Sequence, residues 1–239
     1  MECSVSDGLP GKSADTKSLQ AREPLRYNMA RLLHIESCPR HDITYSSSLV
    51  KAFLEVYREV HPADTIEVMN LWKIDMPPEI SEILEARYAE EIDGDDRISN
   101  NKEAREMIGR YIKHFKSADK YLFTIPTWSF GVPYILKKYI DVITQPELIY
   151  ESTNDGVVRD LVTSDRPACI LYTQGTSGGP RSARRGRDTM FFQVSFMAGW
   201  LRYIGFTHVY SVYDDLADVN QQQVREAREK VVMSIARNF

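Results

Sequence analysis

Hydroxyl side chains gather in one segment, residues 37–48, between a short apolar run and a helical pattern. They belong to Ser37, Thr44, Ser46, Ser47 and Ser48. Free N–H groups at the start of a helix, together with the helix dipole, favour a bound anion. The hydroxyl donors suit a phosphate monoester, and Arg40 and Tyr45 lie in the same segment. Serine and threonine are also ordinary helix N-caps, so a plain capping loop is the alternative.

A second segment, Pro126–Pro133, combines a restricted backbone with aromatic surface. Two prolines and a glycine restrict the chain, and the central residues are Thr127, Trp128, Ser129 and Phe130. A planar heteroaromatic ligand could stack here while the backbone hydrogen-bonds its polar edge. The alternative is that the two aromatic residues only anchor the core or an interface.

A third segment, Thr173–Pro180, is rich in glycine and hydroxyl residues. It begins with Thr173, Gln174, Gly175 and Thr176. A glycine after a strand lets backbone N–H groups approach a ligand closely, although Gly178–Gly179 is equally typical of a flexible turn. Together the three segments describe a phosphate at one end and a flat, polar-edged ring at the other, which fits FMN better than a dinucleotide. The first segment lacks glycine, which argues against the Walker and GxGxxG patterns.

Each of these segments follows a predicted strand. We expect strands over Arg31–Glu36, Thr65–Leu71, Lys120–Ile125, Pro167–Thr173 and Thr207–Val212. Apolar spacing predicts helices over residues 46–60, 79–115 (broken near 93–95), 132–143, 188–204 and 219–237. The alternation predicts an α/β fold that is flavodoxin-like, a five-stranded parallel sheet in the order 2-1-3-4-5 with helices on both faces. Ligands bind such sheets beyond the carboxyl ends of the strands, where the three segments lie.

The composition limits the classes of protein to which this chain can belong. Of the 239 residues, 43% are hydrophobic and 27% are charged, as in ordinary globular proteins. Residues 1–28 have no periodic apolar face, so we expect a disordered N-terminal extension there, and one flavodoxin-like FMN-binding domain over 29–239. With 30 basic and 34 acidic residues, no broad nucleic-acid surface is expected. No apolar run reaches the ~20 residues of a membrane span.

Cysteine and histidine usage points to no further chemistry. Only Cys3, Cys38 and Cys169 occur, so we expect a reducing, cytoplasmic setting without a disulfide framework. His34, Cys38 and His41 could be drawn as metal ligands, but a strand and a loop seldom converge such a trio and no CxxC accompanies it. We therefore expect no metal site.

Residues 30–237 resemble a known family, the FMN-dependent NADH:quinone oxidoreductases called azoreductases, within the flavodoxin-like NAD(P)H quinone reductases. The resemblance rests on the first hydroxyl segment, on PTWSFGVPYILKKYID at 126–141, which is the most specific, and on WLRYIGFTHVY at 200–210. It implies that the FMN phosphate is held by Ser37, Thr44, Tyr45 and Ser46. It also implies that the isoalloxazine lies along Thr127, Trp128, Ser129 and Phe130, with its pyrimidine edge at Thr173, Gln174, Gly175 and Thr176.

Two positions depart from the family pattern. Ser129 stands where the family usually has asparagine, so one side-chain bond to the ring is missing or altered. The sequence TQGT at 173–176 stands where the family often has Ser-Arg-Gly-Gly, so a positive charge near the flavin is lost. Backbone donors can substitute in both places, and we expect flavin binding to survive these changes more easily than substrate preference.

The resemblance implies an enzyme in which NADH or NADPH passes hydride to FMN, and a quinone or an azo compound then receives two electrons. It implies a homodimer, in which a turn or hairpin over Tyr150–Asp160 helps to cover the flavin. The basic cluster Arg181–Arg187 either grips the extra phosphate of NADPH, contacts an acidic partner or remains solvated. No nucleic-acid or membrane partner is expected.

Two other functional classes remain open. The first is an electron carrier or flavin-binding module without its own NAD(P)H reaction. The second is a flavodoxin-like domain that has lost flavin and serves as an interaction scaffold.

Overall fold

A computed structural model describes residues 29–39, 46–77, 102–128, 131–145, 150–152, 158–160, 165–174, 192–215 and 222–239. The extension predicted over residues 1–28 lies outside these ranges. None of the helices in the described ranges is long and apolar enough to cross a membrane.

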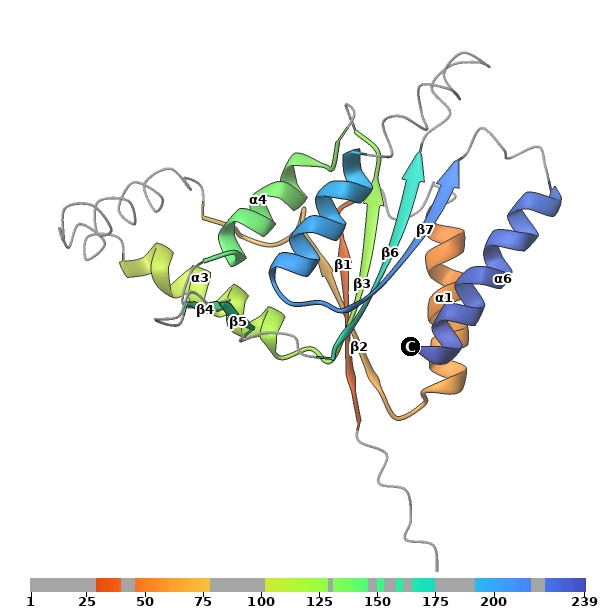
Figure 1. Cartoon of the computed structure of the whole chain (residues 1–239), viewed down its shortest axis with the longest axis horizontal. Helices are drawn as coiled ribbons and strands as arrows, with labels where there is room; N and C mark the ends of the chain where they lie inside the picture. Colours follow the sequence, from red (N-terminus) through yellow and green to blue (C-terminus); the bar gives the residue numbers. More distant parts are fainter. Residues whose placement is uncertain are drawn as a thin grey trace, which may run out of the picture.

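Five parallel strands form the central sheet (Figure 1). They are β1 (Arg31–Glu36), β2 (Thr65–Asn70), β3 (Lys120–Pro126), β6 (Pro167–Gln174) and β7 (His208–Asp215). The spatial order β2-β1-β3-β6-β7 is the predicted order 2-1-3-4-5, so the fold prediction is confirmed. All four strand pairings are parallel, which places every carboxyl end at one edge of the sheet.

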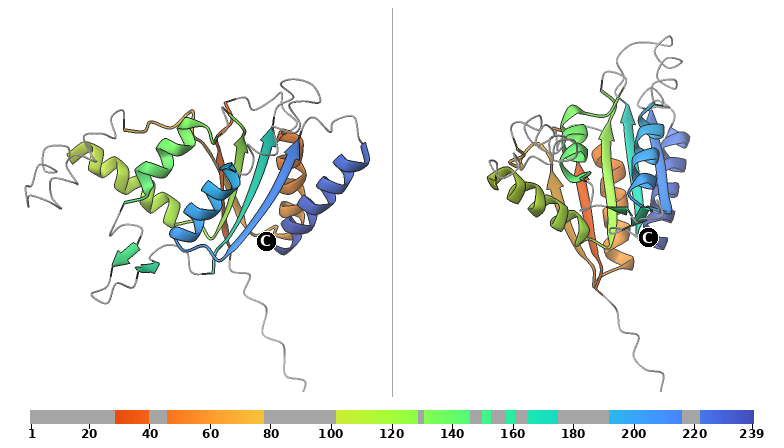
Figure 2. Two further views of the ribbon diagram at one scale, coloured as in Figure 1. Left: turned by 45° about the horizontal axis from the view of Figure 1, so that its top comes forward. Right: turned by 60° about the vertical axis from the view of Figure 1, so that its left-hand side comes forward.

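Helices cover both faces of this sheet, as predicted (Figure 2). The described helices are α1 (Ser46–Val60), α3 (Lys102–Lys116), α4 (Tyr134–Ile143), a helix over residues 192–203, and α6 (Gln222–Asn238). On one face, α1 lies beside α6; α3, α4 and the helix over residues 192–203 cover the other face (Figure 1). The predicted hairpin is also present, as the antiparallel strands β4 (Tyr150–Ser152) and β5 (Val158–Asp160).

Several element boundaries differ from the sequence prediction, most clearly those of β7 and α3. Strand β7 continues three residues beyond Val212 because its end still pairs with β6, where Thr173 faces Asp214 and Gln174 faces Asp215. The polar end of β7 breaks the apolar pattern on which the prediction rested. Of the helical region predicted over residues 79–115, the structure describes α3 from Lys102 onward.

The sheet separates two apolar cores. Leu33 and Ile35 of β1 belong to the core beneath α3, α4 and the helix over residues 192–203, whereas Leu32 packs with α1 and α6. Strand β6 divides in the same way, with Ile170 in the first core and Leu171 in the second. Because the central strands are buried on both faces, as parallel sheets require, their backbone positions are strongly restricted.

Asp64 joins neighbouring elements at the opposite edge of the sheet, where the strands begin. Its carboxylate accepts hydrogen bonds from the Tyr57 hydroxyl (2.6 Å), the Ala30 N–H (2.9 Å) and the Lys120 ammonium (3.0 Å). Burial alone would raise the pKa of this carboxyl, but these three hydrogen bonds outweigh burial and hold the pKa below its ordinary value of 3.8. Asp64 therefore joins α1, β1 and β3 in its ionised form.

Replacing Asp64 with asparagine is expected to lower the free energy of unfolding at neutral pH by about 1–3 kcal/mol, because charged hydrogen bonds are lost. The native carboxyl has the lower pKa, so its contribution is present above pH 3.8 and disappears as pH falls toward the native pKa. Urea unfolding of both proteins at several pH values tests this. The difference in stability should shrink on acidification, and a difference independent of pH would contradict the assignment.

Candidate functional site

Three hydrogen bonds, donated by the first residues beyond β1 and β3, join the strand ends from which the three predicted loops leave. The Ser37 N–H and hydroxyl both donate to the Thr124 carbonyl, at 3.2 and 2.8 Å. The Thr127 N–H donates to the Thr173 carbonyl at 2.7 Å. The carboxyl ends of β1, β3 and β6 are thereby held side by side, at the edge where open α/β sheets bind ligands.

The predicted phosphate segment is described only in part. Ser37 is fully buried, and its hydroxyl proton is used by β3, so in this structure the side chain anchors the loop. Ser46 is the first residue of α1, while Thr44 and Tyr45 lie outside the described residues. Phosphate contacts by these four residues stay a prediction.

The predicted ring segment forms a closed turn. The N–H groups of Trp128 and Gly131 each donate to the other residue's carbonyl, at 3.1 and 2.8 Å. Thr127 is half-buried and Trp128 is 36% exposed, whereas Ser129 and Phe130 lie outside the described residues. The turn therefore leaves the Trp128 ring accessible at the carboxyl edge.

The third predicted segment begins inside the sheet. Thr173 is buried in β6 and accepts the Thr127 bond through its carbonyl oxygen. Gln174 is the last residue of β6. Gly175 and Thr176 lie outside the described residues, so their predicted place at the ring edge is not tested by the geometry.

Two residues missed by sequence reasoning hold these loops in place. Trp72 lies in the turn after β2, its indole N–H donates to the Ser37 carbonyl at 3.0 Å, and its ring lies 5.5 Å from that of Trp128, centre to centre. Gln193 is buried in the helix over residues 192–203 and contacts three residues of the ring segment. Gln193 lies four and seven residues before the apolar Met197 and Trp200, on the same face of the helix. A glutamine on such an inward face could have been identified from the sequence, because buried polar groups need partners.

An aromatic-walled cleft of about 780 Å³ opens beside the ring segment. Its apolar walls are Trp128, Val132, Tyr134, Phe192 and Phe196. Tyr134 and Phe192 are 65% and 64% exposed. Such a concentration of accessible aromatic surface is typical of a binding face.

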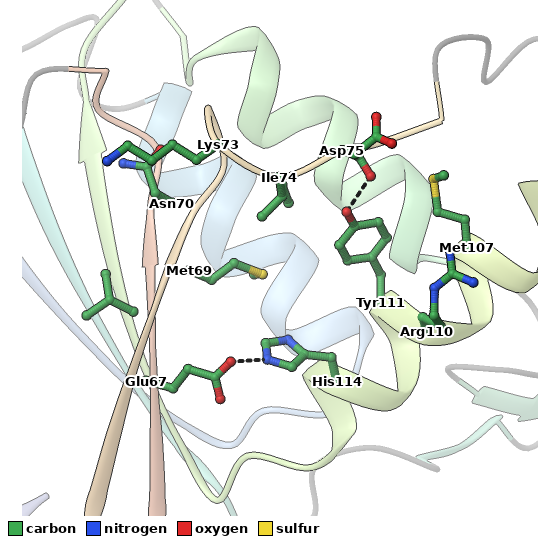
Figure 3. Close-up of a pocket in the computed structure, with 11 residues that line it drawn as sticks. Glu67, Met69, Asn70, Lys73, Ile74, Asp75, Met107, Arg110, Tyr111 and His114 are labelled. Atoms are coloured by element: carbon green, nitrogen blue, oxygen red, sulfur yellow. Dashed lines mark hydrogen bonds and ion pairs between the residues drawn. The ribbon is translucent and has the colours of Figure 1, made fainter.

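A second cleft, of about 660 Å³, lies between β2 and α3 (Figure 3). In it, Glu67 accepts a 2.6 Å hydrogen bond from His114 and also pairs with Arg31. Burial alone would raise the pKa of Glu67, but the contacts with His114 and Arg31 outweigh it and lower the pKa. None of the predicted ligand residues that the structure describes lines this cleft, so it is separate from the described part of the candidate site.

His34, Cys38 and Cys169 occupy ordinary positions, whereas His41 and Cys3 lie outside the described residues. His34 is buried, with Nε2 2.8 Å from the Thr124 hydroxyl oxygen. Cys38 is partly accessible and Cys169 is buried, both as free thiols. Within the described ranges, no group of three or more histidine, cysteine or acidic side chains could hold a metal ion.

Comparison with known proteins agrees with this geometry. Residues 30–235 match the family described as having a flavodoxin-like fold. The FMN-dependent NADH:quinone oxidoreductase of Desulfotalea psychrophila is 32% identical over 184 residues, which cover 77% of this chain and 84% of that protein. The azoreductase of Bacillus anthracis str. Sterne superposes with a TM-score of 0.71 at 23% identity, over 88% of this chain and 100% of that one.

A further solved structure is that of an FMN-dependent NADH-azoreductase from Bacillus anthracis str. Ames Ancestor in complex with FMN. It gives a TM-score of 0.70 at 23% identity, over 87% of this chain and 98% of that one. The fold and the three-loop edge thus define a flavodoxin-like protein. More narrowly, the chain belongs to the family of the FMN-dependent NADH:quinone oxidoreductases and azoreductases, which confirms the resemblance carried by its sequence.

Replacing Trp72 with phenylalanine should loosen the loop after β1, because the aromatic contact can persist while the bond to the Ser37 carbonyl is lost. A bond worth about 1 kcal/mol corresponds to a roughly fivefold rise in local opening. Cys38 is the reporter, since it directly follows Ser37. Because Cys38 is already partly accessible, its alkylation rate, measured in a Cys3→Ser background, is expected to rise by at most about fivefold.

The matched control is Trp200→Phe, which removes a 3.0 Å indole bond to the Thr144 hydroxyl within the core. Cys169 stays silent in both variants, because it is fully buried and burial raises the pKa of its thiol. An equal rise in Cys38 labelling in the control would show general destabilisation and contradict the assignment of Trp72.

Proposed function

We propose that this chain is an FMN-dependent NAD(P)H oxidoreductase that reduces quinones and azo compounds in two-electron, ping-pong fashion. The observation that carries the proposal is the joining of the carboxyl ends of β1, β3 and β6, from which the three proposed ligand loops leave, by the Ser37–Thr124 and Thr127–Thr173 bonds. The family supports it, since relatives at 32% identity are named FMN-dependent NADH:quinone oxidoreductases.

The phosphate end of the site fits an anion. Helix α1 is 15 residues long, begins at Ser46 after the loop from β1, and has no acidic residue in its first turn. Its free N–H groups and dipole favour a phosphate there. In this proposal Thr44, Tyr45 and Ser46 supply hydroxyl donors, and Ser37 contributes through its place in the loop.

The ring end fits a flat heteroaromatic group. The Trp128 ring is accessible beside the half-buried Thr127, and Ser129 and Phe130 continue the proposed contact along the isoalloxazine. Thr173, Gln174, Gly175 and Thr176 meet its pyrimidine edge. When bound, FMN supplies the chemistry of accepting hydride from NADH or NADPH and returning two electrons to an acceptor. The chain positions the ring and excludes water, and we assign no catalytic acid or base.

The proposal extends to a homodimer in the cytoplasm. Tyr134 and Phe192 lie exposed on neighbouring helices that line the aromatic cleft, and aromatic residues are enriched where protein surfaces meet. The free thiols of Cys38 and Cys169 are compatible with a reducing compartment.

Flavin binding and turnover test the enzyme directly. The purified protein, loaded with FMN, should show flavin absorption bands and oxidise NADH or NADPH with menadione as acceptor. Bound flavin without NAD(P)H turnover would support the electron-carrier alternative. Failure to bind FMN would overturn the proposal and favour the scaffold alternative.

The dimer is tested by Phe192→Glu, which places a charge in the aromatic cleft. Burying an unpaired carboxylate in an interface is costly, so the dimer dissociation constant should rise at least tenfold in sedimentation equilibrium. Val231→Glu is the control, since Val231 is similarly exposed but lies on α6, over the other face of the sheet. A monomeric native protein would refute the dimer and leave the flavin assignment standing.

A further inference from the structure

We propose that Gln193 is the positioning residue of the ring-contacting loop, residues 126–133, and that it fixes the Thr127 hydroxyl as a hydrogen-bond acceptor toward the flavin ring. This inference rests on the proposed function and assigns a role to a residue outside all three predicted loops. It follows from the contacts of a single side-chain amide.

Gln193 holds both ends of the loop at once. Its Oε1 accepts from the Thr127 hydroxyl at 3.0 Å, and its Nε2 lies 3.4 Å from the Pro126 carbonyl oxygen, so it contacts the point where the chain leaves β3. The same Nε2 donates to the Gly131 carbonyl, where the loop turns back. With 1% of its surface exposed, Gln193 cannot exchange these partners for water without opening the core.

The orientation of the amide is determined by its partners. Carbonyl oxygens only accept hydrogen bonds, so the end of Gln193 that faces Pro126 and Gly131 must be the NH₂ group. A flipped amide would set Oε1 against two carbonyl oxygens and leave buried groups unpaired, at substantial cost. The bonding network therefore requires Oε1 to face Thr127.

This orientation decides what Thr127 can offer a ligand. Since Oε1 has no proton to give, the Thr127 hydroxyl must donate to it. Only the lone pairs of the Thr127 oxygen remain for another group, so this half-buried hydroxyl can accept from an N–H and cannot donate to a carbonyl. The isoalloxazine ring carries both kinds of edge group, and Thr127 is matched to its N–H.

Gln193 also fastens the turn to the helix. The Gly131 carbonyl accepts from the Trp128 N–H as well as from Gln193, so it is the point at which turn and helix are joined. Losing the Gln193 bond would leave the turn closed but free to move relative to the helix over residues 192–203. The aromatic face of Trp128 would then no longer hold one position for a stacked ring.

Gln193→Met tests the role, because methionine matches the length and volume of glutamine without its hydrogen bonds. The dissociation constant for FMN is expected to rise about tenfold, which is the change expected when lost ordering of the loop costs as much as one or two bonds of ordinary strength. The matched control is Gln145→Met. Gln145 is 8% exposed and its Nε2 donates to the Asp141 and Val142 carbonyls, at 2.8 and 3.3 Å, away from the loop.

Fluorine NMR of 5-fluorotryptophan-labelled protein gives a readout that needs no flavin, since the chain has only 3 tryptophans. Gln193→Met should shift or broaden the Trp128 resonance. Gln145→Met should instead affect Trp200, whose indole bonds to Thr144 beside Gln145. If the native protein binds no FMN, the proposed function fails while this spectrum still tests the positioning role.

A double-mutant cycle tests the coupling to Thr127. Thr127→Val should weaken FMN binding in the native background and have little further effect in Gln193→Met, because the hydroxyl is no longer oriented. Additive effects of the two changes would refute the orientation of Thr127. An unchanged FMN affinity and an unchanged Trp128 resonance in Gln193→Met, or an equal loss of affinity in Gln145→Met, would overturn the positioning role.

Discussion

The hydrogen bond from the Thr127 N–H to the Thr173 carbonyl is the constraint on which the candidate site depends. It continues the β3–β6 pairing one step past the end of β3, so the first residue of the loop after β3 is still joined to β6. The paired bonds from Ser37 to the Thr124 carbonyl do the same for β1 and β3. Parallel order alone places the strand ends at one edge. These bonds also fix the positions of Ser37 and Thr127, the first residues of the loops after β1 and β3.

The two cores explain why these positions are stable. Phe123 of β3 packs toward α3 and α4, while the adjacent Leu122 packs toward α1 and α6, and both are fully buried. Because interiors are packed as densely as organic crystals, β3 cannot slide relative to β1 or β6 without opening a cavity on one face. The end of β3 therefore holds Thr127 at a fixed position at the carboxyl edge of the sheet. Trp72 then holds the loop after β1, and Gln193 the loop after β3, relative to these fixed strands.

Both helical layers and the β4–β5 hairpin were predictable from the sequence because they follow from local periodicity and turn composition. The strand order was predictable because five strands alternating with helices match the flavodoxin-like order. The roles of Trp72 and Gln193 were not, because their partners lie 35 and 62–67 residues away along the chain. Periodicity places Gln193 on an inward helix face but cannot say which carbonyls it meets. Similarly, the sequence predicts that the Ser37 hydroxyl donates to a phosphate, whereas in the structure it donates to the Thr124 carbonyl. Hydrogen-bond partners of this kind can be assigned only when the register of the neighbouring strands is known.

The described part of the edge is organised by neutral groups, and this bears on the two departures from the family pattern. Ser37, Trp72, Thr127 and Gln193 hold the loops through bonds to carbonyl oxygens or to one another, which salt screens little. None of these bonds involves the side chain of Ser129 or Gln174. These four side chains thus hold the ends of β1 and β3 through contacts of their own. In the proposed function, a change at position 129 or 174 therefore alters the ring edge while these bonds still hold the strand ends in place.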